Sequence, residues 1–147
     1  TAARLEQCAF DESTLEAADF STASTLSTSF FKCRGKAPNF SGATLEKAIF
    51  SQAVLPQANF TQATLRMAVL SGADFSAAQF NHATLNDCQC QAMQAPKAAF
   101  VGADLSGSDL HGADLTDCDW REANRSAVRA PDPERLAAQR WQPAHQE

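Results

Sequence analysis

The chain has 147 residues, of which 44% are hydrophobic and 20% are charged, and its formal net charge is −5. This length predicts one domain, and no run approaches the roughly 20 consecutive apolar residues that a membrane span requires. A negative net charge without a basic patch argues against direct binding to nucleic acid.

Large apolar residues recur at every fifth position, and within this pattern lies a second one with a period of 20. The most regular column consists of aromatic residues: Phe20, Phe40, Phe60, Phe80, Phe100 and Trp120. A second column reads Phe10, Phe30, Phe50, Leu70, Cys90 and Leu110. Helices and ordinary strands do not produce these spacings, whereas self-similarity at a fixed period is typical of a solenoid. Below, each apolar fifth residue is called the centre of its unit.

The residue two places before each centre is small almost throughout the chain. It is alanine at every twentieth position from Ala3 to Ala123. One large and one small inward residue per five indicates a turn in each unit, so that four units close a square coil of 20 residues. If the coils pair as parallel strands do, about six coils stack at about 4.8 Å each into a rod near 30 Å long.

Several units resemble the A(D/N)LXX motif of the pentapeptide-repeat family, among them Ala103-Asp104-Leu105-Ser106-Gly107 and Ala113-Asp114-Leu115-Thr116-Asp117. The resemblance covers roughly residues 1–125. It implies an all-β fold, a right-handed quadrilateral parallel β-helix, and no enzyme activity. We expect residues 126–147 to form a tail with a short helix that caps the last coil, with Asp132 as its N-cap residue and Pro133 at its first position.

The repeat is least regular in residues 21–40. Thr25 and Gly35 stand at centres, and Pro38 takes a small inner position. Two interpretations remain open at this point. The irregularity indicates either a bulge or small loop, or a feature that faces a partner.

All five cysteines occupy positions that point inward: Cys8, Cys33, Cys88, Cys90 and Cys118. Free thiols in a core behave as small apolar groups, and a reducing compartment such as the bacterial cytoplasm is expected. Cys88-Gln89-Cys90 has no second Cys or His pair at ligand spacing, so no metal and no cofactor are predicted. The three histidines, His82, His111 and His145, are isolated, and no catalytic constellation is present.

Two functions come from the family resemblance. The first is a scaffold or docking module that binds a protein, as in the domains of larger bacterial proteins associated with secretion, type VI systems included. The alternative is a DNA mimic that binds and protects or inhibits a type II topoisomerase, DNA gyrase, as in quinolone-resistance proteins of this family. Residues 1–20 and 101–124 are acidic, but residues 21–100 carry 3 acids and 6 bases. Because no long acidic stripe exists, we favour the docking module.

Two surfaces are candidates for binding. The residue before each centre is predicted to face water and is usually polar, but Ile49, Val54 and Val69 break this rule. Together with Leu26 and Phe31 they form a candidate interaction patch for a protein partner or for a second copy in a homodimer, unless they only reflect strand propensity. The second candidate is an acidic collar of one residue per face: Asp104, Asp109, Asp114 and Asp119.

Overall fold

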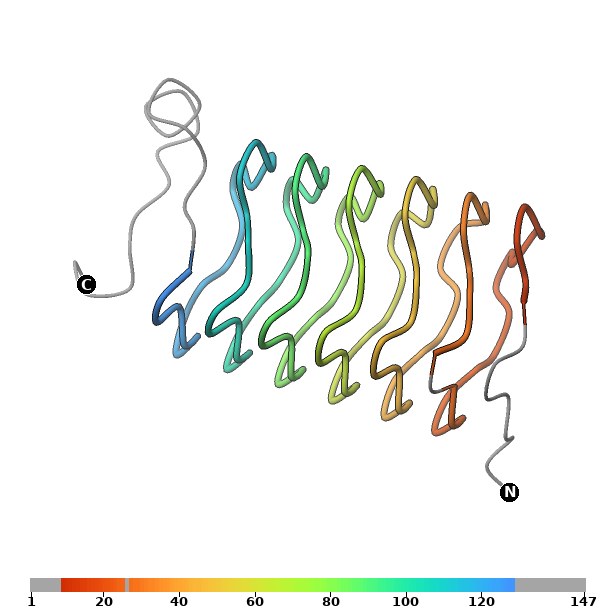
Figure 1. Ribbon diagram of the computed structural model, residues 1–147, viewed down its shortest axis with the longest axis horizontal. Helices are drawn as coiled ribbons and strands as arrows, with labels where there is room; N and C mark the ends of the chain where they lie inside the picture. Colours follow the sequence, from red (N-terminus) through yellow and green to blue (C-terminus); the bar gives the residue numbers. More distant parts are fainter. Residues whose placement is uncertain (1–8, 26, 129–147) are drawn as a thin grey trace.

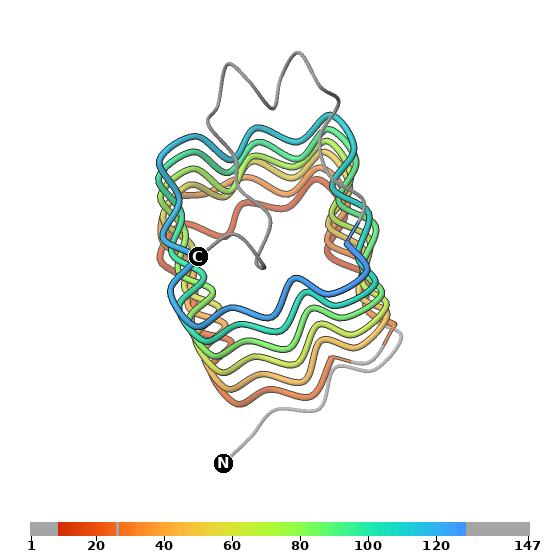
Figure 2. The ribbon, with the colours of Figure 1, turned by 90° about the vertical axis from the view of Figure 1, so that its left-hand side faces the viewer.

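The computed structural model describes residues 9–25 and 27–128, and these residues wind into a rod of stacked coils (Figure 1). Viewed from the end of the rod, each coil is a quadrilateral (Figure 2). The described residues form short parallel bridges rather than helices or longer strands. Each bridge joins the residue before a centre to the residue 20 positions later, from Ala9 with Ser29 to Asp104 with Asn124. The period of 20 in the sequence is therefore the length of one coil.

The backbone hydrogen bonds follow the same repeat, as the unit centred on Phe60 illustrates. The Phe60 amide donates to the carbonyl of Gln79 in the next coil at 2.6 Å, and Gln62 donates to Asn81 at 2.9 Å. Within the unit, the Ala63 amide donates to the Phe60 carbonyl at 3.0 Å and closes a turn. The polar backbone groups are thus satisfied between coils, so the interior can be filled with apolar side chains.

The corners of the coil require a left-handed backbone conformation at the second residue after each centre. Gly42 and Gly72 occupy this position in two units with φ of 68° and 67°, but Lys47, Gln62 and many other residues adopt φ near 60° as well. With the hydrogen bond across four residues, this is the geometry of a type II turn. A non-glycine residue there costs on the order of 1 kcal/mol. The hydrogen bonds between coils and the buried core must offset that cost.

The aromatic column stacks along the whole described rod. Phe60 lies parallel to Phe40 and Phe80, with ring centroids 5.0 and 4.9 Å apart, and the column ends with Trp120 stacked on Phe100 at 4.6 Å. The second column meets the first edge to face, as Phe50 does against Phe60 at 88°. The two columns identified in the sequence are therefore two neighbouring stacks of side chains in one core.

The irregular stretch does not contain a bulge in its described part. The bridges Ser24 with Thr44, Ser29 with Ile49 and Arg34 with Val54 keep the spacing of 20, so the interpretation as a bulge or small loop is wrong there. Thr25 is fully buried at its centre because its hydroxyl donates to the Thr44 carbonyl at 2.9 Å. A polar centre is tolerated where the backbone offers it an acceptor.

The repeat continues slightly further than the sequence indicated. Asn124 still bridges Asp104, and Arg125 occupies the next centre, where it is buried. Its guanidinium carbon lies 4.9 Å from the centroid of the Trp120 ring, and Val128 packs against the core. Arg125 therefore covers part of the last aromatic layer, which the sequence did not predict. The expected capping helix falls on residues 129–147, outside the described part of the chain.

Candidate protein-interaction surface

The residue before each centre displays its side chain from a fixed backbone. Ile49 shows this arrangement: its amide donates to the Thr28 carbonyl at 3.0 Å, and its carbonyl accepts from Phe30 at 2.6 Å. Its neighbours Ala48 and Phe50 are fully buried, whereas Ile49 itself is 38% exposed. A side chain at this position therefore faces outward without contributing to the core.

Three apolar residues lie in adjacent coils on one face, and we call Ile49, Met67 and Val69 the central apolar patch. Ile49 and Val69 are bridge partners in adjacent coils, and Met67 lies two residues before Val69. Two large hydrophobic residues of the described part are exposed to solvent: Ile49 at 38% and Met67 at 46%. The bridge places Ile49 and Val69 side by side, as their separation by one coil length of 20 residues requires.

Sequence reasoning missed Met67, although a signal was present. The equivalent residues of the neighbouring coils are all small or polar: Ser27, Lys47, Asp87 and Gly107. Met67 has φ of 60° at a turn corner, where its long apolar side chain has no place in the core. An apolar residue at a position that is otherwise small or polar marks the patch as clearly as Ile49 does.

The other predicted members of the patch lie apart from its centre. Val54 bridges Arg34 and Asp74 one unit further along the coil, so it lies on the adjacent face and is half-buried. Phe31 is half-buried at the turn of the preceding coil, and the Nζ atom of Lys32 lies 5.2 Å from its ring centroid. Leu26 lies outside the described residues. The structure therefore gathers Ile49 and Val69 but separates Val54 from them.

One edge of the central apolar patch is charged. Arg66 and Glu46 occupy the same corner in adjacent coils, and their Nη1 and Oε2 atoms are 3.6 Å apart. Lys47 is exposed beside Glu46, and its amide donates to the Arg66 carbonyl at 2.9 Å. The arrangement of an apolar centre beside a charged edge is similar to that of protein-binding surfaces, which have an apolar core and a polar rim.

The four aspartates of the proposed acidic collar each stabilise a turn. Their carboxylates accept hydrogen bonds from the backbone amide two residues later, at 3.0 to 3.2 Å: Asp104 from Ser106, Asp109 from His111, Asp114 from Thr116 and Asp119 from Arg121. Asn39 and Asn59 make the same bond elsewhere in the rod. Asx residues at this position therefore satisfy turn amides, a structural role that recurs along the repeat.

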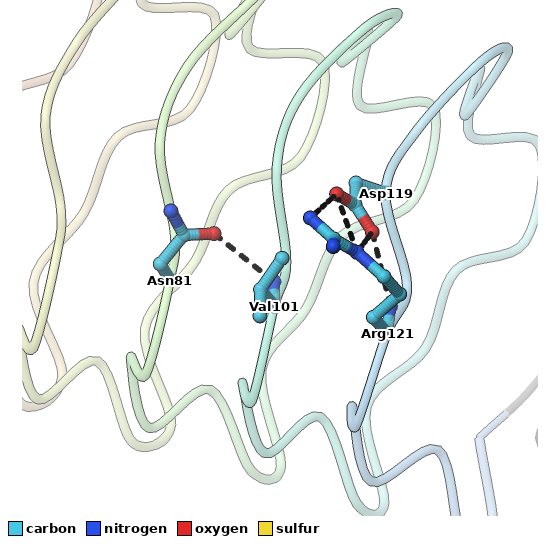
Figure 3. A network of polar contacts seen from close by, with 4 residues as sticks. All are labelled: Asn81, Val101, Asp119 and Arg121. Atoms are coloured by element: carbon cyan, nitrogen blue, oxygen red, sulfur yellow. Dashed lines mark hydrogen bonds and ion pairs between the residues drawn. The ribbon is translucent and has the colours of Figure 1, made fainter.

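One member of the collar is also paired with a cation. The guanidinium of Arg121 donates to both carboxylate oxygens of Asp119, and Nη2 lies 2.6 Å from Oδ2 (Figure 3). These hydrogen bonds from Arg121 lower the pKa of Asp119. At the same corner of preceding coils, Asn81 accepts from the Val101 amide at 3.0 Å. Arg121 thus compensates the charge of Asp119, which weakens the collar as an acidic surface.

The described cysteines lie in the core as predicted, with Cys33, Cys88 and Cys90 buried and Cys118 partly buried. Burial raises the pKa of Cys33 to about 11 and that of Cys118 to about 12. A hydrogen bond with Cys88, followed by burial, raises the pKa of Cys90. In residues 9–25 and 27–128, no group of three or more His, Cys, Asp or Glu side chains could hold a metal ion, and no helix is long and apolar enough to cross a membrane.

These thiols should resist alkylation in the folded protein. Because the thiolate is the reactive form, the raised pKa values of Cys33, Cys90 and Cys118 leave little thiolate at pH 8. Cys88 is protected by its burial, which blocks access of the reagent. We expect iodoacetamide to leave Cys33, Cys88, Cys90 and Cys118 unmodified in native buffer and to modify all four in denaturant, as read by peptide mass spectrometry. Rapid native labelling of Cys88 or Cys90 would contradict the inward orientation of their unit.

Two solved structures with a similar fold are pentapeptide-repeat proteins. HetL of Nostoc sp. strain PCC 7120, which is involved in heterocyst differentiation regulation, aligns with a TM-score of 0.62 at 16% identity over 87% of this chain and 89% of its own. A protein of the Arabidopsis thaliana thylakoid lumen aligns with a TM-score of 0.57 at 29% identity over 74% of this chain and 68% of its own. QnrB1, a plasmid-mediated fluoroquinolone resistance protein, reaches a TM-score of only 0.33 at 22% identity.

The sequence itself identifies the same family. A search of curated proteins found no match. The profile of pentapeptide repeats matches with eight copies, in segments 39–76, 55–89, 73–112 and 85–121, which together extend over more than half of the chain. With the quadrilateral coil, the units of five residues and the right-handed β-helix of its structural relatives, the chain belongs to the pentapeptide-repeat family.

Proposed function

We propose that this chain is a non-enzymatic protein-interaction module and that the central apolar patch is its binding surface. The observation that carries the proposal is the exposure of Ile49 and Met67 at positions where a polar residue would serve the fold equally well. Exposed apolar groups that cluster on a rigid frame are typical of interfaces. Because backbone hydrogen bonds hold Ile49 and Val69 to the preceding coil, a partner would meet the patch without ordering it first.

DNA mimicry directed at a type II topoisomerase is less well supported by the distribution of charge. A DNA mimic needs negative charge that continues along a face over several coils. On the face that begins with Asp19 and ends with Asp119, the equivalent residues between them are uncharged: Asn39, Asn59, Gln79 and Ala99. The aspartates of the collar lie in one coil and stabilise turns.

The decisive variant replaces the apolar pair with the residue that other faces carry. Ile49→Thr with Val69→Thr should change the free energy of unfolding by less than about 1 kcal/mol, because neither side chain fills the core. Binding of protein partners should be lost, as measured by quantitative affinity capture against the unmodified chain. The patch variant is therefore expected to separate binding from folding.

A matched control changes the same unit position on the opposite face. Gln79 and Ala99 are also bridge partners in adjacent coils, so Gln79→Thr with Ala99→Thr makes an equivalent double substitution. This control should retain both its melting temperature and its partners. If the patch variant also keeps every partner, the apolar residues reflect strand propensity and the proposed function fails.

A further inference from the structure

We propose that the central apolar patch binds a second copy of the chain, packed face to face in antiparallel orientation. This inference rests on the proposed function, since it assigns an occupant to the same surface. The twofold axis would lie across the face, midway between the coil of Ile49 and the coil of Val69, which the backbone bridge shows to be neighbours. A twofold interface requires a surface that is complementary to itself.

The apolar residues meet this requirement. The proposed axis exchanges adjacent coils while it keeps each corner on the same side of the face. Ile49 of one copy therefore lies opposite Val69 of the second copy, and Val69 opposite Ile49. Met67 lies opposite Lys47, whose aliphatic stem can cover the thioether. All four residues would be shielded from water by one packing event.

The charged rim is also complementary to itself under this twofold axis. The same exchange places Glu46 opposite Arg66 of the second copy, and Arg66 opposite Glu46, so that each intramolecular pair becomes part of a four-residue network. Further from the axis, Asp11 falls opposite His111. The remaining described pairs on this face contain no like charges: Ala9 with Asp109, Ser27 with Asp87, Ser29 with Gln89, Phe31 with Gln91, Lys32 with Ala92, Ser51 with Ser71, Gln52 with Gly72, and Glu12 with Gly112.

A parallel face-to-face arrangement would lack this complementarity. In that case each coil meets its own copy, so Asp109 would lie opposite Asp109 of the second copy. Glu46 would lie opposite Gln52, and Arg66 opposite Gly72, which leaves both charges without a partner in the second copy. Like charges in direct opposition disfavour an interface. The sequence of this face therefore selects the antiparallel orientation.

The contact is small, which sets the strength expected of it. A face of about six coils and three extended residues measures roughly 30 Å by 10 Å, so two copies bury on the order of 600 Å² in total. Stable complexes bury about 1,200 Å² or more. Self-association should therefore be weak, with a dissociation constant of about 0.1 mM within a factor of ten. It should weaken further as salt screens the charged rim.

Charge reversal tests the register without disturbing the core. Glu46→Arg makes residues 46 and 66 both cationic, and Arg66→Glu makes both anionic. The intramolecular pair that each substitution breaks is partly exposed, with 47% of the Arg66 and 32% of the Glu46 side chain accessible, so it contributes little to stability. Sedimentation velocity from about 10 µM to 1 mM should show reversible association of the unmodified chain. Each single variant should self-associate with about tenfold lower affinity than the unmodified chain. An equimolar mixture of the two variants should recover association within about twofold, because each rim then meets its opposite.

Each outcome has a separate meaning. If the unmodified chain stays monomeric at about 1 mM, the dimer is excluded, and loss of other partners by the Ile49→Thr, Val69→Thr variant would then leave the proposed function standing with a different occupant. If the chain associates but both reversal variants associate equally well, the antiparallel packing is wrong. If the chain is monomeric and the patch variant keeps every partner, both proposals fail.

Discussion

Replacing Phe60 by alanine should lower the free energy of unfolding by about 3 to 5 kcal/mol. Its ring is fully buried and stacks between Phe40 and Phe80 at centroid distances of 5.0 and 4.9 Å. It also contacts Phe50 and Phe75 edge to face, at 5.6 and 5.3 Å. The hydrogen bonds between coils hold these four rings in place, so the cavity cannot collapse and most of the lost contact energy is not recovered.

The control for Phe60 is a substitution four residues later in the same coil. Thr64 is only half-buried and faces outward, so Thr64→Ala should cost well under about 1 kcal/mol. Urea denaturation of both variants, followed by circular dichroism, measures the difference. Similar losses for the two variants would contradict the assignment of Phe60 to the core and Thr64 to the surface.

Much of the fold could be predicted because each unit of five residues repeats the same physical requirement. Phe60 must point inward in the same way as Phe40, so the period of 20 directly reports which residues stack. Prediction failed at units in which a polar or charged residue, instead of an apolar one, occupies the centre. Thr25 is buried as a polar centre because a carbonyl lies within reach, and Arg125 occupies a centre because it packs on Trp120. Neither compensation can be read from residue type alone.

The candidate site was predictable only in part. The bridge between Ile49 and Val69 follows from the coil length, so their proximity was available from the sequence. The structural role of Asp104 and Asp114 was not available from the sequence. An aspartate whose carboxylate accepts a hydrogen bond from a turn amide has the same sequence pattern as an aspartate that binds a partner. Met67 does not interrupt the pattern of apolar centres, because turn positions hold residues of many types, and it stands out only against the small or polar residues of its own column.

The second large effect is expected at Gly35, where alanine should destabilise the protein by about 2 to 4 kcal/mol. Gly35 has φ of 148°, unlike the other glycines, whose φ lies near 70°. A Cβ atom at this position would lie 2.6 Å from both the Leu15 carbonyl carbon and the Glu16 amide nitrogen of the preceding coil. These are backbone atoms, so relief requires the two coils to move apart, which strains the bond from the Leu15 amide to the Arg34 carbonyl.

Gly72→Ala is the matched control because Gly72 stands at an ordinary corner. Its φ of 67° is close to the 51 to 62° that many non-glycine residues of the rod adopt, and an added Cβ would meet only the Gln52 side chain at 3.7 Å. We expect a loss of about 1 kcal/mol in thermal or urea unfolding, which is the cost of a non-glycine residue in the left-handed conformation. Gly35→Leu sharpens the test, since it restores the apolar centre that the repeat prefers. If contact with the Leu15 backbone dominates, this variant is less stable than the natural chain. A gain in stability would show instead that residue 35 can adopt the regular conformation of a centre, and that glycine is not required there by the packing of the two coils.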